Sequence, residues 1–335
     1  MSMTLAASLI SLTESGSSDR TFEFWSFGRR EGDGRHYLTA AELLVRSQAC
    51  AARLQDMCKP ADRAVILCPP GLDYIVAFYA CQLAGIIAVP AYPPSNRKHL
   101  ARLWSIIDDA DASVVLSTSE LIPSVQKNAG IDRRLPPILA VDDVDCGDCH
   151  HWVTPDLAPD AISFLQYTSG TTGNPKGVVV SHERLLSNVA AIAERFQLNS
   201  QSRGVFWLPP YHDMGLIGAL VMPVVVAGKA ALMSPASFLQ QPLRWLDAIS
   251  EFQATITAGP DFAYQLCVDA VRETDPGALD LSRLRLALSG AETVRAATLD
   301  AFVERFEPFG FRRESFVPVY GLAETVLMAS GQRSR

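Results

Sequence analysis

With 335 residues, of which 48% are hydrophobic, the chain is long enough to bury a sizeable core and to form one large or two ordinary domains. Its 29 basic and 36 acidic side chains give a formal net charge of -7 without any basic block, which argues against nucleic acid as the main partner, because binding to phosphates needs clustered Lys and Arg. The N-terminus lacks the basic segment and apolar length of a signal peptide, and the longest uncharged apolar stretch, 214–228, is too short for a transmembrane segment, so we expect a cytoplasmic protein.

From Thr39 onward, helical and strand patterns alternate. Thr39-Ala-Ala-Glu42 is a capping box, which predicts a helix to about Met57. An apolar run at 63–68, a helix at 72–84 closed by Gly85, and a second run at 86–89 predict a βαβ unit. Further strands are expected at 113–117, 138–141, 162–167, 178–180, 205–207, 255–258, 285–288 and 316–320, and further helices at 98–110, after Ser181, at 238–250, 262–273 and 294–306, with a helix and then a strand in 214–228. The alternation predicts an α/β fold of mostly parallel sheets covered by helices on both faces, in which ligands bind beyond the carboxyl ends of strands.

Seven cysteines at irregular spacings, in a chain without an export signal, predict reduced thiols rather than disulfides. The run Cys146-Gly-Asp-Cys149-His150-His151 matches a haem attachment pattern and half of a zinc site. Because c-type haem requires export, structural zinc requires another ligand pair, and the neighbouring residues form a polar acidic loop, we interpret this run as a coincidence.

The segment with the clearest chemistry is Tyr167-Thr-Ser-Gly-Thr-Thr-Gly-Asn-Pro-Lys-Gly177. Its glycines let the backbone turn amides toward an anion, its hydroxyls add donors, and its lysine supplies positive charge. It is not a Walker A loop, because Asn-Pro and a strand follow Gly173. A polar hairpin turn would need neither four hydroxyls nor a lysine. We therefore predict that the phosphates of ATP are bound by Thr168, Ser169, Gly170, Thr171, Thr172, Gly173 and Lys176.

This string, followed by Val178-Val-Val-Ser-His182, resembles the signature loop of the adenylate-forming superfamily, which includes acyl-CoA synthetases, adenylation domains of peptide synthetases and luciferases. The segment Val319–Thr325 is similar to the motif whose tyrosine, here Tyr320, stacks on adenine and whose glutamate, here Glu324, helps hold Mg²⁺. The segment Ser289–Glu292 is similar to the one that packs on the other adenine face. Small residues let a flat base approach the backbone, and a carboxylate beside phosphates suits Mg²⁺. Taken alone, Glu324 at a helix start would be a favourable dipole contact.

The resemblance therefore implies a nucleotide site formed by Ser289, Gly290, Ala291, Glu292, Tyr320, Gly321, Leu322, Ala323 and Glu324, and a Mg²⁺ site formed by Glu324 and Thr171. In the loop Leu208–Gly215 a lone histidine is more often structural, but the superfamily has an aromatic residue or histidine at this position beside the substrate carboxylate. We assign catalysis to Lys176, Thr171, Glu324 and His212, and substrate binding to His212, Asp213, Met214, Gly215 and Phe262. An acyl channel along 214–221 and 262–266 is expected, although core packing explains these residues equally well.

The segments 209–218, 258–264 and 289–292, the last with 302–311 behind it, resemble fatty acyl-AMP ligases, and the resemblance covers roughly 22–331. These ligases activate fatty acids for carrier proteins of polyketide or nonribosomal peptide assembly. Thr293 departs from the proline common there. The resemblance implies two α/β lobes, 1–180 and 181–335, and attack of a fatty-acid carboxylate on ATP to give acyl-AMP and pyrophosphate. ATP and Mg²⁺ are the implied cofactors, and an acyl carrier protein the implied partner.

Family members continue with a ribose-binding aspartate, a hinge and a small domain that carries a catalytic lysine, and these have no counterpart before Arg335. We therefore expect this polypeptide alone to bind nucleotide weakly and to turn over poorly or not at all. Two alternatives remain open. In the first, the acyl acceptor is coenzyme A. This alternative stays open because the insertion that separates the two families lies beyond the chain's end. In the second, the chain is a non-catalytic nucleotide- or lipid-binding module, which a natural stop after Arg335 would favour.

Overall fold

The computed structural model describes residues 4–14, 20–27, 34–94, 96–129, 133–168, 175–273 and 277–331. Backbone contacts divide the chain into two compact units. Unit 1 comprises Met1–Asp19 and Leu38–Ser187, and unit 2 comprises Arg20–Tyr37 and Asn188–Arg335. Each unit is built around a sheet and is described by itself.

The sheet of unit 1 has the strand order β6-β5-β3-β4-β7-β8. Its strands are β3 (Arg63–Ile66), β4 (Ile87–Pro90), β5 (Ala112–Ser117), β6 (Ile138–Ala140), β7 (Ile162–Thr168) and β8 (Lys176–Ser181). All neighbours are parallel except β7 and β8, which form an antiparallel pair. The helices are α1 (Leu5–Glu14), α2 (Ala40–Met57), α3 (Leu72–Ala84), α4 (Arg97–Asp109), α5 (Ile122–Ala129) and α6 (His182–Phe196), the last of which continues into unit 2.

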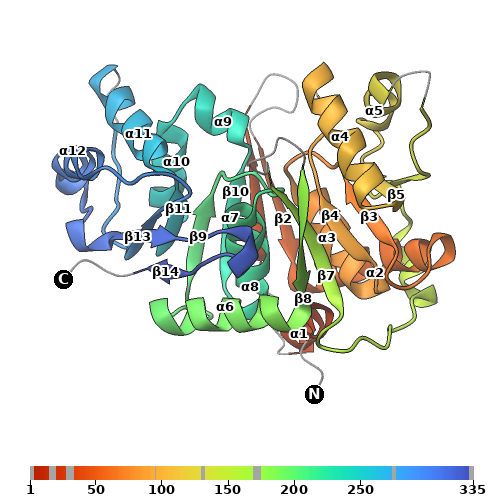
Figure 1. Ribbon diagram of the computed structural model, residues 1–335. Coiled ribbons are helices and arrows are strands. Elements are labelled where there is room, and N and C mark those ends of the chain that lie inside the picture. Colours follow the sequence, from red (N-terminus) through yellow and green to blue (C-terminus); the bar gives the residue numbers. More distant parts are fainter. Residues whose placement is uncertain are drawn as a thin grey trace. The chain divides into compact units, whose positions relative to one another are not determined.

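Helices cover this sheet because its strands are apolar on both faces. Val65 of β3 packs with Leu103 and Trp104 of α4, and Ala64 and Ile66, which alternate with it, are equally buried. Helix α3 contacts β3 and β4. The unit is therefore a layered α/β structure (Figure 1).

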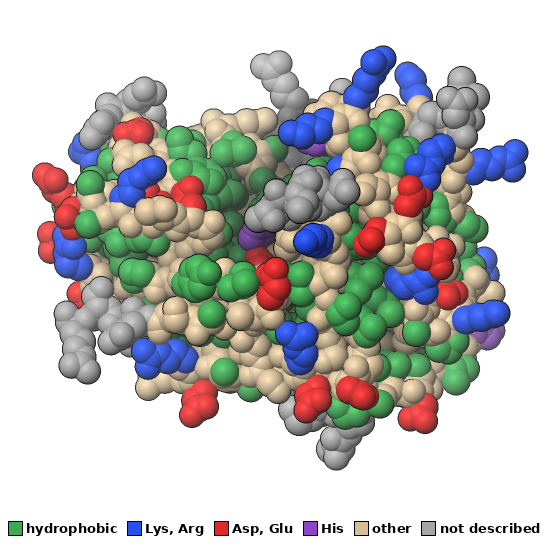
Figure 2. Space-filling view, viewed as in Figure 1, with side chains coloured by type: hydrophobic (Ala, Val, Ile, Leu, Met, Phe, Trp, Pro, Cys, Tyr) green, Lys and Arg blue, Asp and Glu red, His purple; other side chains and the backbone are tan. Residues whose placement is uncertain are grey.

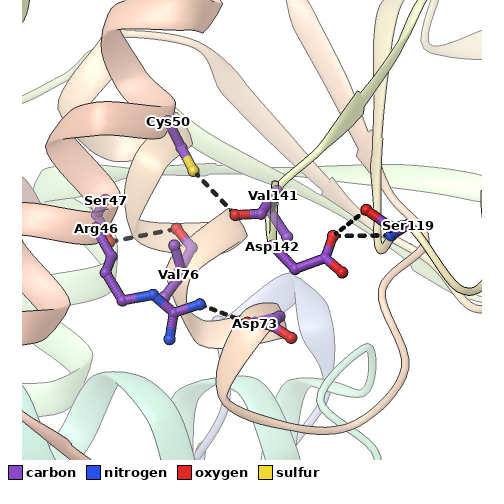
Figure 3. Close-up of polar contacts among 8 residues, drawn as sticks. All are labelled: Arg46, Ser47, Cys50, Asp73, Val76, Ser119, Val141 and Asp142. Atoms are coloured by element: carbon purple, nitrogen blue, oxygen red, sulfur yellow. Dashed lines mark hydrogen bonds and ion pairs between the residues drawn. The ribbon is translucent and has the colours of Figure 1, made fainter. Parts of the chain in front are cut away.

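Polar contacts join α2 to α3 and to the segment that follows β6 (Figure 3). The guanidinium of Arg46 lies 2.6 Å from the Asp73 carboxylate, and the Cys50 thiol donates to the carbonyl of Val141. Burial raises the pKa of Cys50 to about 12, so this thiol stays protonated and is structural. All seven cysteines are free, and the described residues contain no group of His, Cys, Asp and Glu that could hold a metal.

The sheet of unit 2 has the strand order β14-β13-β12-β11-β9-β10-β1-β2. Its strands are β1 (Arg20–Ser26), β2 (Gly34–Thr39), β9 (Arg203–Phe206), β10 (Lys229–Met233), β11 (Ile256–Gly259), β12 (Leu286–Ser289), β13 (Phe316–Tyr320) and β14 (Ser330–Gly331). The neighbours from β1 through β13 are parallel, and β13 and β14 are antiparallel. The helices are α7 (Asp213–Gly215), a π-helix (Leu216–Val221), α8 (Met222–Val225), α9 (Pro235–Gln240), α10 (Leu243–Glu251), α11 (Asp261–Glu273) and α12 (Ala296–Phe306).

Helices α10, α11 and α12 lie beside β11 and β13 (Figure 1), and residues of the three helices, of β12 and of β13 form an aromatic core. Tyr264 packs edge-on against Phe302 at a centroid distance of 5.3 Å, and Trp245 and Phe306 are fully buried. This packing fixes the starts of α11 and α12, which lie next to the carboxyl ends of β11 and β12.

Most of the predicted elements are confirmed, including the α/β class with mostly parallel sheets. Thr39 forms both bonds of the capping box with Glu42, and α3 ends before Gly85. The helix predicted over 238–250 was wrong, because it is two helices: Gln241, which precedes Pro242, is extended, as residues before proline tend to be. Elements α1, β1, β2, α5 and β14 (Ser330–Gly331) were not predicted, and the strand expected within 214–228 lies beyond it, as β10 (Lys229–Met233).

On the face drawn in Figure 2, acidic and basic side chains are interspersed, as expected for a chain without a basic block. Among the described residues, no helix combines the length and the apolar character needed to cross a membrane. The apolar stretch 214–228 contains the helical segment that ends at Val225, and β10 follows from Lys229.

Candidate functional site

Predicted site residues follow the carboxyl ends of four neighbouring strands in unit 2. Strands β9, β11, β12 and β13 are adjacent and parallel, so their carboxyl ends meet at one edge of the sheet. His212 and Asp213 come after β9, and Phe262 comes after β11. The segments Ser289–Glu292 and Tyr320–Glu324 begin at the last residues of β12 and β13. The topology therefore brings four sequence-distant predictions to one edge, where ligands bind in parallel sheets.

His212 and Asp213 are joined by a side-chain hydrogen bond at the start of α7. Nδ1 of the imidazole lies 2.7 Å from Oδ1 of Asp213, whereas the Met214 N–H is 3.4 Å from Nδ1 and only 2.6 Å from the same Asp213 oxygen. Nδ1 therefore carries a proton toward Asp213. The hydrogen bond to Asp213 raises the pKa of His212, against the opposing effect of burial. With its side chain 53% exposed, His212 is an imidazole oriented by Asp213 at the site edge, where its raised pKa favours interaction with a carboxylate.

The chain after His212 enters the core as an unusual helix. Gly215 is buried and the following turn is a π-helix, Leu216–Val221, a conformation that is frequent at functional sites. A cavity of about 20 Å³ beside it is lined by Phe206, Gly218 and Met222, among others. That volume holds about one water.

Two aromatic residues form an apolar wall at the edge. The ring of Phe262 is 40% exposed and contacts Trp207 edge-on at 6.0 Å, and Trp207 stacks on Phe238 at 4.0 Å. Trp207 is buried, and its indole N–H has no hydrogen-bond partner among the described residues. Sequence reasoning missed Trp207, although its place directly after β9 was a usable signal. The wall offers an apolar substrate contact area and one unused donor.

The segment Ser289–Glu292 approaches β13 closely. Ser289 is fully buried, and its hydroxyl has no partner within the described part of the chain. A Cβ atom on Gly290 would lie 2.7 Å from Cγ2 and 2.8 Å from the carbonyl oxygen of Val319, so only glycine fits there. Ala291 has a left-handed φ of 64°. The Glu292 carboxylate accepts a hydrogen bond from the backbone N–H of Phe262 at 2.7 Å. This backbone thus forms a flat, small-residue surface, with Glu292 directed at the start of α11.

Tyr320 and Glu324 are both exposed at the end of β13. The Tyr320 ring is 64% exposed, which leaves its face available for stacking. A Cβ atom on Gly321 would lie 1.7 Å from the carbonyl oxygen of Leu327, so the chain can turn back here only with glycine. A 3₁₀ turn, Ala323–Thr325, buries Ala323, leaves Leu322 half-buried and presents Glu324 outward. The segment therefore offers an aromatic face and a carboxylate within one turn of each other.

The turn after Glu324 is held by α6. The side-chain amide of Asn188 donates to the carbonyl of Met328 at 3.0 Å and accepts from its N–H at 3.3 Å. Val326, which lies between Glu324 and Met328 in the sequence, adopts φ 73° and ψ -62°. These are the values of a classic γ-turn, which is strained for a β-branched residue. Asn188 therefore stabilises a strained turn next to the predicted site, a role that no sequence pattern signalled.

The phosphate loop belongs to unit 1, and its two described ends face each other. Thr168 and Lys176 are opposite one another in the antiparallel pair of β7 and β8, and Lys176 is exposed. The hydroxyl of Tyr167 donates to Asp109 at 2.6 Å, which together with burial raises the pKa of this tyrosine. The predicted residues Ser169, Gly170, Thr171, Thr172 and Gly173 lie outside the described residues. The hairpin thus sets a hydroxyl beside an ammonium group at the base of the loop.

Comparison with known proteins identifies a family and similar relatives. A family model described as "AMP-binding enzyme" matches residues 16–334. The Medium-chain-fatty-acid--[acyl-carrier-protein] ligase JamA of Moorena producens is 36% identical over 324 residues, which is 95% of this chain and 54% of that protein. The Long-chain-fatty-acid--AMP ligase FadD32 of Mycolicibacterium smegmatis is 38% identical over 318 residues, 92% of this chain and 50% of that protein. The chain spans about half the length of these curated relatives.

Solved structures share the fold. The fatty acid AMP ligase from Legionella pneumophila superposes with a TM-score of 0.93 at 37% identity, over 99% of this chain and 57% of that one. A fatty acyl-adenylate ligase from L. pneumophila, in complex with acyl adenylate and pyrophosphate, gives a TM-score of 0.91 at 38% identity, over 99% of this chain and 57% of that one. The sheets and helices described above are therefore those of the N-terminal part of such ligases.

Proposed function

The chain belongs to the AMP-binding enzyme family, and from that premise we propose that the complete protein uses ATP to convert a fatty acid to acyl-AMP and passes the acyl group to an acyl carrier protein. Relatives named as fatty-acid--AMP ligases and as fatty-acid--[acyl-carrier-protein] ligases support both halves of the proposal. The observation that carries it is the single sheet edge that presents an exposed aromatic face, a carboxylate, an oriented imidazole and an apolar wall.

In the proposed reaction, a carboxylate oxygen of the fatty acid bonds to the α-phosphorus of ATP. The bond from that phosphorus to the oxygen bridging the β-phosphate breaks, and pyrophosphate leaves with the electron pair. No proton changes hands, so the protein's contribution is positioning and charge neutralisation. Tyr320 stacks on one adenine face and Ser289–Glu292 packs on the other. The imidazole of His212, held by Asp213, orients the fatty-acid carboxylate.

The leaving polyphosphate needs positive charge. Lys176 and the backbone amides of the loop that it closes supply part of it, with Thr168 as a hydroxyl donor. The exposed Glu324 carboxylate fits Mg²⁺, because this ion binds few protein oxygens and takes its other ligands from phosphates and water. Bound there, Mg²⁺ would neutralise charge on the phosphates. Thr171, the second predicted ligand, lies outside the described residues.

The acyl chain would begin at the wall of Phe262 and Trp207 and run along the helical segment that contains Met214 and Gly215. The wall supports an apolar substrate, because a partly exposed aromatic ring beside a buried one offers contact area without polar competition.

The test uses the complete protein and measures two steps separately. Exchange of labelled pyrophosphate into ATP, with fatty acids of graded length, reads adenylation. Transfer of labelled acyl groups to a phosphopantetheinylated carrier protein, with coenzyme A in parallel, reads the acceptor. We expect fatty-acid-dependent exchange and transfer to the carrier. No exchange by the folded protein with any fatty acid would refute the adenylation proposal, and transfer to coenzyme A alone would refute the carrier.

A further inference from the structure

A fully buried carboxylate lies between the two substrate sides of the site. Asp261 is the first residue of α11, and its side chain is 0% exposed. Oδ1 accepts the backbone N–H of Arg295 at 2.8 Å, and Oδ2 accepts the hydroxyl of Thr298 at 2.9 Å. The Arg295 guanidinium is 3.7 Å from Oδ2. A buried carboxylate is tolerated only with such partners, so this side chain is firmly bonded to the start of α12.

A second carboxylate connects the same two helices in the opposite direction, from the loop before α12 to the start of α11. Glu292, in the loop that leads to α12, accepts the N–H of Phe262 in the first turn of α11 at 2.7 Å. Each helix start is thus bonded by an acid from the other segment: Glu292 accepts an N–H from the first turn of α11, and Asp261 accepts the N–H of Arg295, the residue before α12, which provides no side-chain cap of its own. We call Asp261 and Glu292 together the carboxylate clasp.

The loop held by the clasp does not rest in a relaxed conformation. Ala291 has a φ of 64°, and Gly290 lies against Val319 so closely that a Cβ atom would collide. Strain of this kind persists only where neighbouring contacts determine the backbone. The clasp supplies such contacts at both ends of the loop: Glu292 follows Ala291 directly, and Asp261 bonds Arg295 four residues on.

We propose that Asp261 is a positioning residue that, through the carboxylate clasp, fixes the acyl-side turn at Phe262 and the adenine-side loop at Ser289–Glu292 relative to each other. The inference rests on the proposed function, which places the two substrates on these two segments. In-line attack requires the carboxylate oxygen and the α-phosphorus within about 3–3.5 Å, and a 1 Å misplacement costs about 100-fold in rate. Asp261 itself is buried and touches neither substrate.

The test compares four variants of the complete enzyme: Asp261→Ala, Asp261→Asn, Glu292→Ala and the double variant Asp261→Ala/Glu292→Ala. Asp280→Ala is the matched control, because Asp280 also accepts a backbone N–H, that of Ser282 at 3.0 Å, but lies before the amino end of β12. Thermal unfolding of each variant is measured first, and the kinetics are recorded well below the lowest melting temperature.

We expect Asp261→Ala to lower kcat/KM for ATP and for the fatty acid together, each by about tenfold or more, which corresponds to about 1.4 kcal/mol. Asparagine keeps an acceptor for Arg295 and a hydrogen-bonding partner for Thr298, so Asp261→Asn recovers most of the activity. The double variant loses less than the product of the two single losses, because both carboxylates hold one loop. Asp280→Ala keeps wild-type kinetics.

Unchanged kinetics in Asp261→Ala, a loss confined to one substrate, or fully multiplicative losses in the double variant would overturn the clasp. Titration of AMP without fatty acid gives a second readout, with weaker binding expected in Asp261→Ala and recovery in Asp261→Asn. The AMP titration separates the two proposals. If the wild-type enzyme binds AMP but makes no acyl-AMP, the proposed function is refuted, and the effect of Asp261→Ala on AMP binding still tests the clasp.

Discussion

The buried His182 predicts an acid-sensitive attachment of the N-terminal helix in unit 1. His182 is 2% exposed at the start of α6, and its Nδ1 accepts the backbone N–H of Leu5, the first residue of α1, at 3.2 Å. Burial lowers the pKa of His182 from 6.5 to about 4. Protonation would also turn the Nδ1 acceptor into a donor that faces the Leu5 N–H, and would place positive charge at the positive end of the α1 dipole.

The sign and size of the effect follow from the two pKa values. The folded-state pKa is below the unfolded value, so the neutral imidazole stabilises the fold fully above pH 6.5, and this contribution is lost as the pH falls toward about 4. One pKa unit is worth about 1.4 kcal/mol, so the whole contribution is about 3 kcal/mol at most. About 2 kcal/mol of it is lost at pH 5, because there the unfolded imidazole is protonated and the folded one is still mostly neutral.

The assay is urea unfolding of the chain and of His182→Asn at pH 8, 7, 6 and 5. Asparagine can keep an acceptor near the position of Nδ1 but has no proton to bind in this range. The difference between the two unfolding free energies cancels the carboxylates and the other five histidines. We expect wild type to lose about 2 kcal/mol relative to His182→Asn between pH 8 and pH 5. A constant difference across this range would refute the reasoning, as would an imidazole pKa near 6.5 from NMR titration of the folded protein.

Three further predictions concern the site and its supports. In the complete enzyme, Lys176→Ala lowers the rate of pyrophosphate exchange by about 10- to 100-fold without changing the melting temperature, because the exposed ammonium contributes charge for the phosphates and no packing. Tyr320→Ala raises KM for ATP by about tenfold in initial-rate assays, whereas Tyr320→Phe keeps the stacking face and stays near wild type. Asn188→Ala removes both hydrogen bonds to Met328 and lowers the free energy of unfolding in urea by about 1–3 kcal/mol, compared with less than about 0.5 kcal/mol for the control Asn128→Ala, whose contacts are long.

The elements that the sequence predicted are those whose signal is local. The buried parallel strands β3, β4 and β5 are short apolar runs bounded by helices with recognisable ends, such as the capping box of Thr39 and Glu42. Strand β1 was missed because what makes it a strand is its pairing with β10, about 200 residues later in the chain, which no local window contains. The helix over 238–250 was wrong because the apolar period runs through Pro242 while the backbone does not.

The residues of the candidate site also fall into two groups, those with a local sequence signal and those without one. Residues that we propose to meet a ligand, such as Tyr320 and Lys176, stand in motifs that the sequence shows directly. The groups that hold those motifs in place act across the chain: Glu292 bonds a residue 30 positions away, Asp261 one 34 positions away, and Asn188 one 140 positions away. Their partners are backbone amides, which carry no sequence identity, so no pattern of residue types could reveal the contacts.

Glu292 belongs to both groups, because it stands in a sequence motif and also makes a long-range contact that holds the motif in place. The resemblance assigned it to the adenine-side loop, and in the structure one of its oxygens is used by the Phe262 amide. A carboxylate has about four lone-pair sites, so the bond to Phe262 leaves acceptor capacity for a ligand. The two roles are therefore compatible. A nucleotide contact depends on the charge or the acceptor at position 292, whereas the clasp depends on a side chain long enough to reach the N–H of Phe262 in α11. Glu292→Gln keeps the reach and an acceptor for the amide, and Glu292→Asp keeps the charge and shortens the reach. If the clasp is the main role, the first substitution preserves kcat/KM for the fatty acid and the second lowers it.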